Sequence, residues 1–135
     1  MRPHGAAVLA LMALGACVET PMEPTAEFGA IAFQQDCAAC HGTDAMGAGS
    51  FGAELIEQPP DLTTISARNG GVFPRDEVMS VIDGFARGDH FSAAMPEFGA
   101  GDMGEIILIE GKGGVSTPVP VRLLALSQYL ESIQR

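Results

Sequence analysis

Two thiols and an imidazole lie within five consecutive residues of this chain, in the stretch Cys37-Ala38-Ala39-Cys40-His41. Thiols at this spacing can each add to one vinyl group of a haem, while the imidazole of the next residue reaches the iron from the same side. One turn of helix brings the three groups together. The motif therefore predicts one covalently bound haem c on Cys37 and Cys40, with His41 as an axial iron ligand.

The two cysteines of this motif could instead bind zinc, form a redox pair or form a structural disulfide. Zinc needs two further ligands, yet no cysteine follows Cys40 and only His90 remains as a later histidine. A thioredoxin-like pair needs a preceding strand and an alternating β/α pattern, which the sequence does not show. A disulfide at this spacing closes too small a loop to stabilise much. Haem is the favoured interpretation if the chain is exported.

The first 16 residues have the features of an export signal. An apolar run from Gly5 to Gly15 follows a weakly basic start, and it is shorter than the roughly 20 residues that span a bilayer. It ends in Leu14-Gly15-Ala16-Cys17, which resembles the bacterial lipobox, where the cysteine sulfur receives a diacylglycerol before cleavage in front of it. An ordinary secretory cleavage site nearby is the alternative. We predict a lipoprotein signal peptide over residues 1–16 and lipidation of Cys17.

The predicted mature chain divides into a tether and one domain. Residues 17–25 contain prolines and acids with almost nothing to bury, which is typical of a short extended linker. Residues 26–135 are enough for a single compact domain. Acyl chains on Cys17 would anchor this domain to a bacterial membrane, facing the periplasm.

The chain is strongly acidic, with a net charge of −10. Removing residues 1–16 takes away Arg2 and none of the 17 acids, which leaves six basic residues and a net charge of about −11. This surface repels nucleic acid and favours redox partners with a basic docking surface, although acidity could also serve solubility alone.

Periodic apolar residues predict helices at both ends of the domain. Residues 26–36 lead into the haem motif, with Phe28, Ile31 and Phe33 available for burial. A helix over residues 122–134 has Thr117 as a plausible N-cap, with Pro118 in its first turn. The apolar stripe of this second helix consists of Leu123, Leu126, Leu130 and Ile133.

The chain resembles the class I cytochrome c family over roughly residues 26–134. That family has a glycine eight residues and an aromatic residue four residues before the first cysteine, and Gly29 and Phe33 stand at those offsets. It also ends in a helix with a Leu-X-X-Tyr-Leu pattern, present here from Leu126 to Leu130. The resemblance implies an all-α mono-haem fold, in which the N- and C-terminal helices cross where Gly29 lacks a side chain.

The resemblance also implies roles around the haem. The family has a Pro-X-Leu after the motif, matched here by Pro60-Asp61-Leu62. The Pro60 carbonyl would then accept a hydrogen bond from His41 Nδ1, and Leu62 would pack on the haem. The family often holds its propionates through Trp and Tyr, but this chain has no Trp. Arg68 and Asn69 are the substitutes we consider, with a plain surface turn as the alternative.

The second axial ligand must come from a methionine or from His90. Met95 lies in a loop of small residues, and Pro96 favours an extended backbone at Met95. A Met-Pro pair well after the motif is also what the family uses, so Met95 is our predicted ligand. His90 is the rival, and two histidines would give a lower potential. The other mature-chain methionines are Met22, Met46, Met79 and Met103, with a helix predicted over residues 75–83 around Met79.

One segment does not fit the family pattern. Residues 105–115 contain four consecutive aliphatic residues and a glycine-rich turn, which could form a short β-hairpin near residues 105–116 beside the haem edge, or a docking patch. For the whole chain we expect a mono-haem electron carrier without substrate turnover of its own. The alternatives are a haem c subunit of a larger membrane redox complex and a haem enzyme or sensor with an open iron site.

Overall fold

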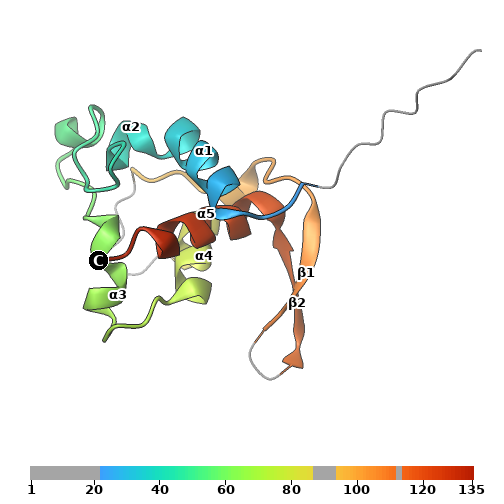
Figure 1. The fold of residues 1–135 in the computed structure, drawn as a ribbon. Coiled ribbons are helices and arrows are strands. Elements are labelled where there is room, and N and C mark those ends of the chain that lie inside the picture. The colour runs from blue at the N-terminus through green and yellow to red at the C-terminus, as the bar shows by residue number, and fades with distance from the viewer. Residues whose placement is uncertain (1–21, 87–93, 112–113) are drawn as a thin grey trace, which may run out of the picture.

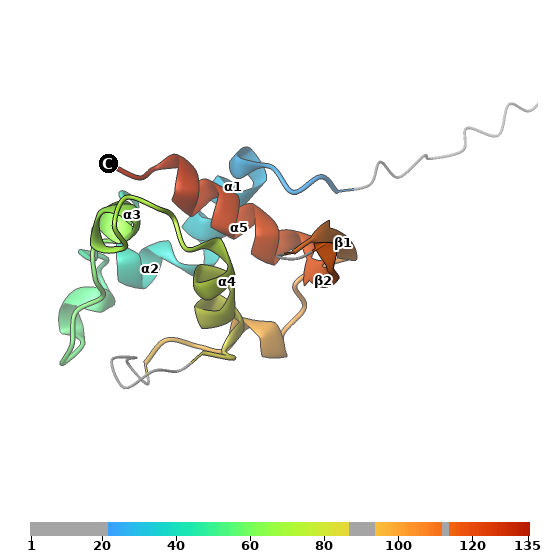
Figure 2. The same ribbon diagram turned by 90° about the horizontal axis from the view of Figure 1, so that it is seen from below.

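The computed structural model describes residues 22–86, 94–111 and 114–135, which form a helical domain with one protruding hairpin (Figures 1 and 2). The helices at the two ends of this domain lie against each other, and α4 packs on the second of them. The elements in chain order are α1 (Ala26–Asp36), α2 (Ala38–His41), α3 (Ile65–Arg68), α4 (Arg75–Asp83), β1 (Ile106–Glu110), β2 (Ser116–Pro120) and α5 (Val121–Ser132), with 3-10 turns at Gly52–Glu54, Leu62–Thr64 and Phe98–Ala100.

The predicted helices over residues 26–36 and 75–83 form with those bounds as α1 and α4. Thr25 begins α1, because its hydroxyl accepts a hydrogen bond from the Phe28 N–H at 3.1 Å. Gly84 ends α4 in the left-handed conformation, with φ of 104°. No helix within the described residues is long and apolar enough to cross a membrane.

The crossing of α1 and α5 depends on Gly29. A Cβ atom at that position would lie 1.9 Å from the Ala125 carbonyl oxygen, so no residue with a side chain fits without moving one helix. One turn further along α1, the rings of Phe33 and Tyr129 contact each other with centroids 5.2 Å apart. The predicted close crossing of the terminal helices is therefore present in the structure.

The buried face of α1 differs in part from the one that we predicted. Gly29, Ala32 and Phe33 are buried, whereas Ile31 is 57% exposed. Successive helical residues are about 100° apart, so a crossing centred on Gly29 turns positions 32 and 33 towards α5 and position 31 towards solvent. Phe33 is 1% exposed and belongs to the core.

The hairpin consists of β1 and β2, which pair in antiparallel fashion, with Leu108 opposite Pro118. It confirms the hairpin that the sequence allowed, but it corrects the predicted N-cap of the last helix. Thr117 and Pro118 lie in β2, and α5 begins at Val121, one residue before the predicted range. A proline suits both the first turn of a helix and an edge strand, so its presence could not distinguish the two.

The start of α5 is capped by backbone carbonyls of the segment before β1 and not by a side chain. The Val121 N–H donates to the Glu105 carbonyl at 2.8 Å, and the Arg122 N–H donates to the Met103 carbonyl at 3.2 Å. These bonds satisfy two of the N–H groups that a helix leaves free at its N-terminus. The segment that leads into β1 is thus hydrogen-bonded to the first turn of α5.

Candidate functional site

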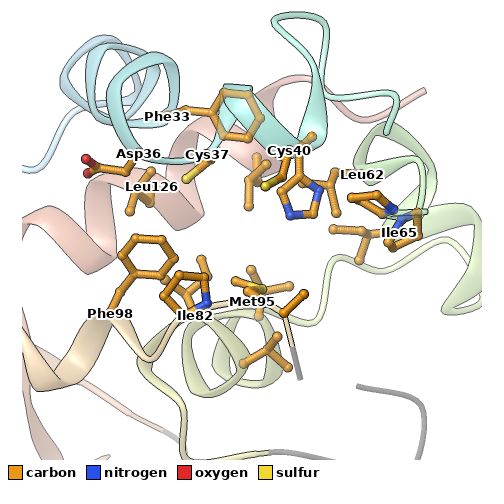
Figure 3. Close-up of a pocket in the computed structure, with 18 of the residues that line it drawn as sticks. Phe33, Asp36, Cys37, Cys40, Leu62, Ile65, Ile82, Met95, Phe98 and Leu126 are labelled. Carbon is orange, nitrogen blue, oxygen red and sulfur yellow. The ribbon is translucent and has the colours of Figure 1, made fainter. Parts of the chain in front are cut away.

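A cavity of about 330 Å³ opens between α2, α4, α5 and the loop that contains Met95. Cys37, Cys40 and His41 line one wall of it, and Met95 lies across the cavity from the two thiols, as Figure 3 shows. This volume is within the range of small-molecule and cofactor sites. The structure therefore brings together four side chains that the sequence predicted as haem ligands or attachment points.

The local fold explains why the motif residues face the same space. Cys37 ends α1, and α2 begins directly after it, so the backbone N–H groups of Cys40 and His41 both donate to the Cys37 carbonyl. This tight turn presents both cysteine side chains to the cavity as free thiols. Among the described residues, no cluster of three or more His, Cys, Asp and Glu side chains has the arrangement of a metal site.

The electrostatics of this wall favour neutral groups. Burial, followed by the nearby Asp36 carboxylate, raises the pKa of the Cys37 thiol to about 12. Burial also lowers the pKa of His41, which favours the neutral imidazole that can ligate a metal. A thioether carries no charge, so converting the Cys37 thiol to one costs nothing in desolvation. The wall thus accommodates uncharged thioethers and a neutral imidazole.

Pro60 and Leu62 both line the cavity, as the sequence predicts for residues that contact the haem. The predicted hydrogen bond from His41 Nδ1 to the Pro60 carbonyl, however, is absent, because Nδ1 is buried without a partner among the described residues. Both residues line the cavity, but this does not fix the rotation of the imidazole, which in metal sites depends on what both ring nitrogens bind.

The two residues predicted to contact the propionates are placed differently. Arg68 lines the cavity, and its guanidinium donates to the Asp61 carbonyl at 2.8 Å and to the Thr64 hydroxyl. Asn69 does not line the cavity; its side-chain N–H donates to the Val72 carbonyl at 2.8 Å, within a surface turn. The plain-turn alternative therefore describes Asn69, and only Arg68 stays a candidate for a propionate contact.

A clamp from the C-terminus, which the sequence did not reveal, holds the segment with Leu62 against the cavity. The Gln134 side chain donates to the Leu62 carbonyl and accepts from the Ser66 N–H, each at 2.8 Å. The Arg135 guanidinium donates to the Asp61 carboxylate at 2.8 Å. Hydrogen bonds from Thr63 and then from Arg135 lower the pKa of Asp61. These partners are about 70 residues apart in the chain, so no local pattern could indicate them.

Of the methionines in the described part of the chain, Met95 lines the cavity and the others do not. Met79 and Met103 are buried in the core, while Met22 and Met46 are exposed. The loop with Met95 lies close to the end of α4, since a Cβ atom on Gly99 would be 2.7 Å from the Asp83 carbonyl oxygen. His90 and Cys17 lie outside the described residues.

Several wall residues come from elements that the sequence did not assign to the site. Val78 and Ile82, one turn apart on α4, line the cavity, and so does Phe98, which follows Met95 in the chain. Their spacing of four residues indicates that they share one helix face, but the sequence does not show what that face packs against. No described residue of the hairpin lines the cavity, so the structure gives no support to the suggested position beside the haem edge.

A helical domain whose terminal helices cross around a Cys-X-X-Cys-His motif, with the thiols and the imidazole facing one apolar cavity, defines a c-type cytochrome. The chain belongs to the family described as cytochrome c oxidase, cbb3-type, subunit III, whose model matches residues 24–106, more than half of the 135 residues. No curated protein and no solved structure matches in the other two comparisons. This family implies covalently bound haem c and electron transfer, and cytochrome c domains are typically exported.

Proposed function

We propose that this protein is a mono-haem electron carrier that is anchored by lipid on Cys17 and faces the bacterial periplasm, with His41 and Met95 as axial iron ligands. The observation that carries the proposal is the position of Met95 across the cavity from the Cys37 and Cys40 thiols. A thioether on the wall facing the motif is the arrangement that a six-coordinate His/Met haem requires.

Different residues of this chain would have different roles around the haem. When bound, haem c supplies an iron that takes up and returns single electrons. Cys37 and Cys40 would hold it through thioether bonds, and the neutral His41 imidazole would be free to ligate. Apolar side chains of the cavity wall would exclude water from the ligands. These apolar residues include Phe33, Leu62, Ile65, Ile82 and Leu126. No substrate has to enter this arrangement, which favours an electron carrier over an enzyme.

Reduction with carbon monoxide present, together with a redox titration, tests this proposal. We expect the purified haem-loaded protein to titrate as one single-electron step, with the visible spectrum of a low-spin haem c. Because His41 and Met95 would both occupy the iron, carbon monoxide should bind slowly at neutral pH. Rapid binding by the wild-type protein would instead identify an open iron site, and two titration steps would contradict a single haem.

A second candidate function is a haem c subunit that stays bound within a membrane redox complex. The family description, subunit III of a cbb3-type oxidase, favours it specifically. The acidic surface suits a basic docking partner in this case too. Both functions require the same site, and they differ in whether the chain leaves its partner.

Fractionation of membranes distinguishes the two. We expect the full chain to sediment with the membranes through its lipid and, after detergent extraction, to elute at its own size, separate from oxidase activity. Elution with an integral membrane oxidase or reductase would support the subunit alternative. Recovery of the full-length chain in the soluble fraction would contradict the lipid anchor, and Cys17→Ser provides the unlipidated reference for that fraction.

A further inference from the structure

The hairpin has two free edges, and their backbone groups can be assigned from its register. The Val121 N–H bonds to the Glu105 carbonyl at 2.8 Å, and the Gly111 N–H bonds to the Val115 carbonyl at 2.9 Å. Hydrogen-bonded and non-hydrogen-bonded pairs alternate along an antiparallel ladder. Three pairs between these two ends are therefore non-hydrogen-bonded: 106 with 120, 108 with 118, and 110 with 116. The backbone N–H and C=O groups of these residues point away from the partner strand.

The outward edge of β2 is blocked, whereas that of β1 is open. Pro118 and Pro120 occupy two of the three outward positions of β2 and have no N–H to donate. On β1 the outward positions are Ile106, Leu108 and Glu110, each with both a donor and an acceptor. Within the described ranges, none of these groups makes a backbone hydrogen bond outside the hairpin. One edge is closed to strand addition and the other is available for it.

The side chains along the open edge favour a particular kind of strand. Ile106 is 57% exposed and Leu108 is 71% exposed, and they lie on the same side of the hairpin. Glu105 and Glu110 flank them, in a chain of net charge −10. A second copy of this chain would bring equally acidic ends to the edge, which opposes self-pairing. A strand with alternating aliphatic residues and basic ends matches both features.

We propose that the free edge of β1 binds an extended segment of a partner protein as a third strand, and that this segment carries aliphatic residues between lysine or arginine residues. The edge is separate from the haem cavity, since no described hairpin residue lines that cavity. It is nevertheless joined to the cavity wall, because the Glu105 and Met103 carbonyls cap α5, which supplies Leu126 to that wall. The family match ends at Ile106, so almost all of the hairpin lies outside it.

A synthetic nine-residue peptide, in which valine and threonine alternate between terminal lysines, tests the edge. With the full haem-loaded chain we expect saturable binding in fluorescence anisotropy and slower amide hydrogen exchange at Leu108 and Glu110. Leu108→Pro removes an outward N–H without removing a ladder bond and should weaken binding by about tenfold or more. Leu108→Thr keeps that N–H and should retain most of the affinity.

The remaining measurements decide between edge pairing and its rivals. Equal loss of binding in Leu108→Pro and Leu108→Thr would show apolar adhesion and overturn the proposal. So would equal binding of a peptide with glutamate at both ends, or self-association of the chain through β1 in place of peptide binding. Protection of the Ile107 and Ile109 amides reports whether each variant keeps its hairpin. If Leu108→Pro loses that protection, Pro118→Thr is used as the test variant instead. It supplies an outward N–H on β2, so a second bound peptide per chain is expected.

The test does not depend on the proposed axial ligands. An unchanged visible spectrum in the Leu108 variants would show that the haem domain is intact, whatever residue ligates the iron. Failure of the carrier proposal would appear in that spectrum and in carbon monoxide binding, while failure of the edge proposal would appear only in peptide binding and exchange.

Discussion

Met95→Ala should remove the weak absorption band near the red end of the visible range that accompanies thioether ligation of haem iron. It should also let carbon monoxide bind rapidly to the reduced protein. Because methionine sulfur favours the reduced iron, we expect the reduction potential to fall by roughly 0.2 V, within the ≈0.8 V range over which axial ligands set haem potentials. A redox titration and carbon monoxide kinetics measure these changes.

Two matched variants separate ligation from packing. Met95→Leu conserves the volume of a half-buried side chain and should lose the band just as alanine does. Met103→Leu changes a buried methionine that does not line the cavity, and should leave the spectrum unchanged. If His90→Ala abolished the low-spin spectrum while Met95→Ala kept it, the rival histidine would be the ligand.

Gly29→Ala should destabilise the fold although alanine is the better helix former. Helix propensity alone predicts a gain of about 1 kcal/mol. The added Cβ, however, would lie 1.9 Å from the Ala125 carbonyl oxygen, a backbone atom that cannot rotate away. Separating α1 from α5 should cost about 3 kcal/mol, at the upper end of ordinary overpacking. Guanidinium unfolding of the haem-loaded protein, followed by haem absorbance, gives the free energy of unfolding.

Gly101→Ala is the control for this prediction. Gly101 has φ of −100°, and a Cβ atom there would have its nearest neighbour at 3.4 Å. The free energy of unfolding of Gly101→Ala should therefore change by no more than about 0.5 kcal/mol. A stabilised Gly29→Ala variant would mean that the two helices do not cross as closely as the structure has them. The crossing matters for the site, because it brings Phe33 and Leu126 together on the cavity wall.

Much of the fold could be predicted because its signals are local. Residues 26–36 and 75–83 have helical periodicity with clear ends, and both helices form with those bounds. The N-cap of α5 could not be placed, because Thr117 and Pro118 suit a helix start and an edge strand equally. Only the pairing of Pro118 with Leu108, across the hairpin, decides for the strand.

The sequence by itself predicted the chemistry: the spacing of Cys37, Cys40 and His41 is that of a haem attachment motif, whose groups need only one helical turn to meet. It also pointed to Met95 as the proposed second ligand, because Pro96 favours an extended backbone there and the resembled family uses a Met-Pro pair. The tertiary structure alone decided that Met95 faces the thiols, that Gln134 holds the Leu62 segment, and that one edge of the hairpin is open. Each of these depends on contacts between distant residues, which sequence periodicity cannot report.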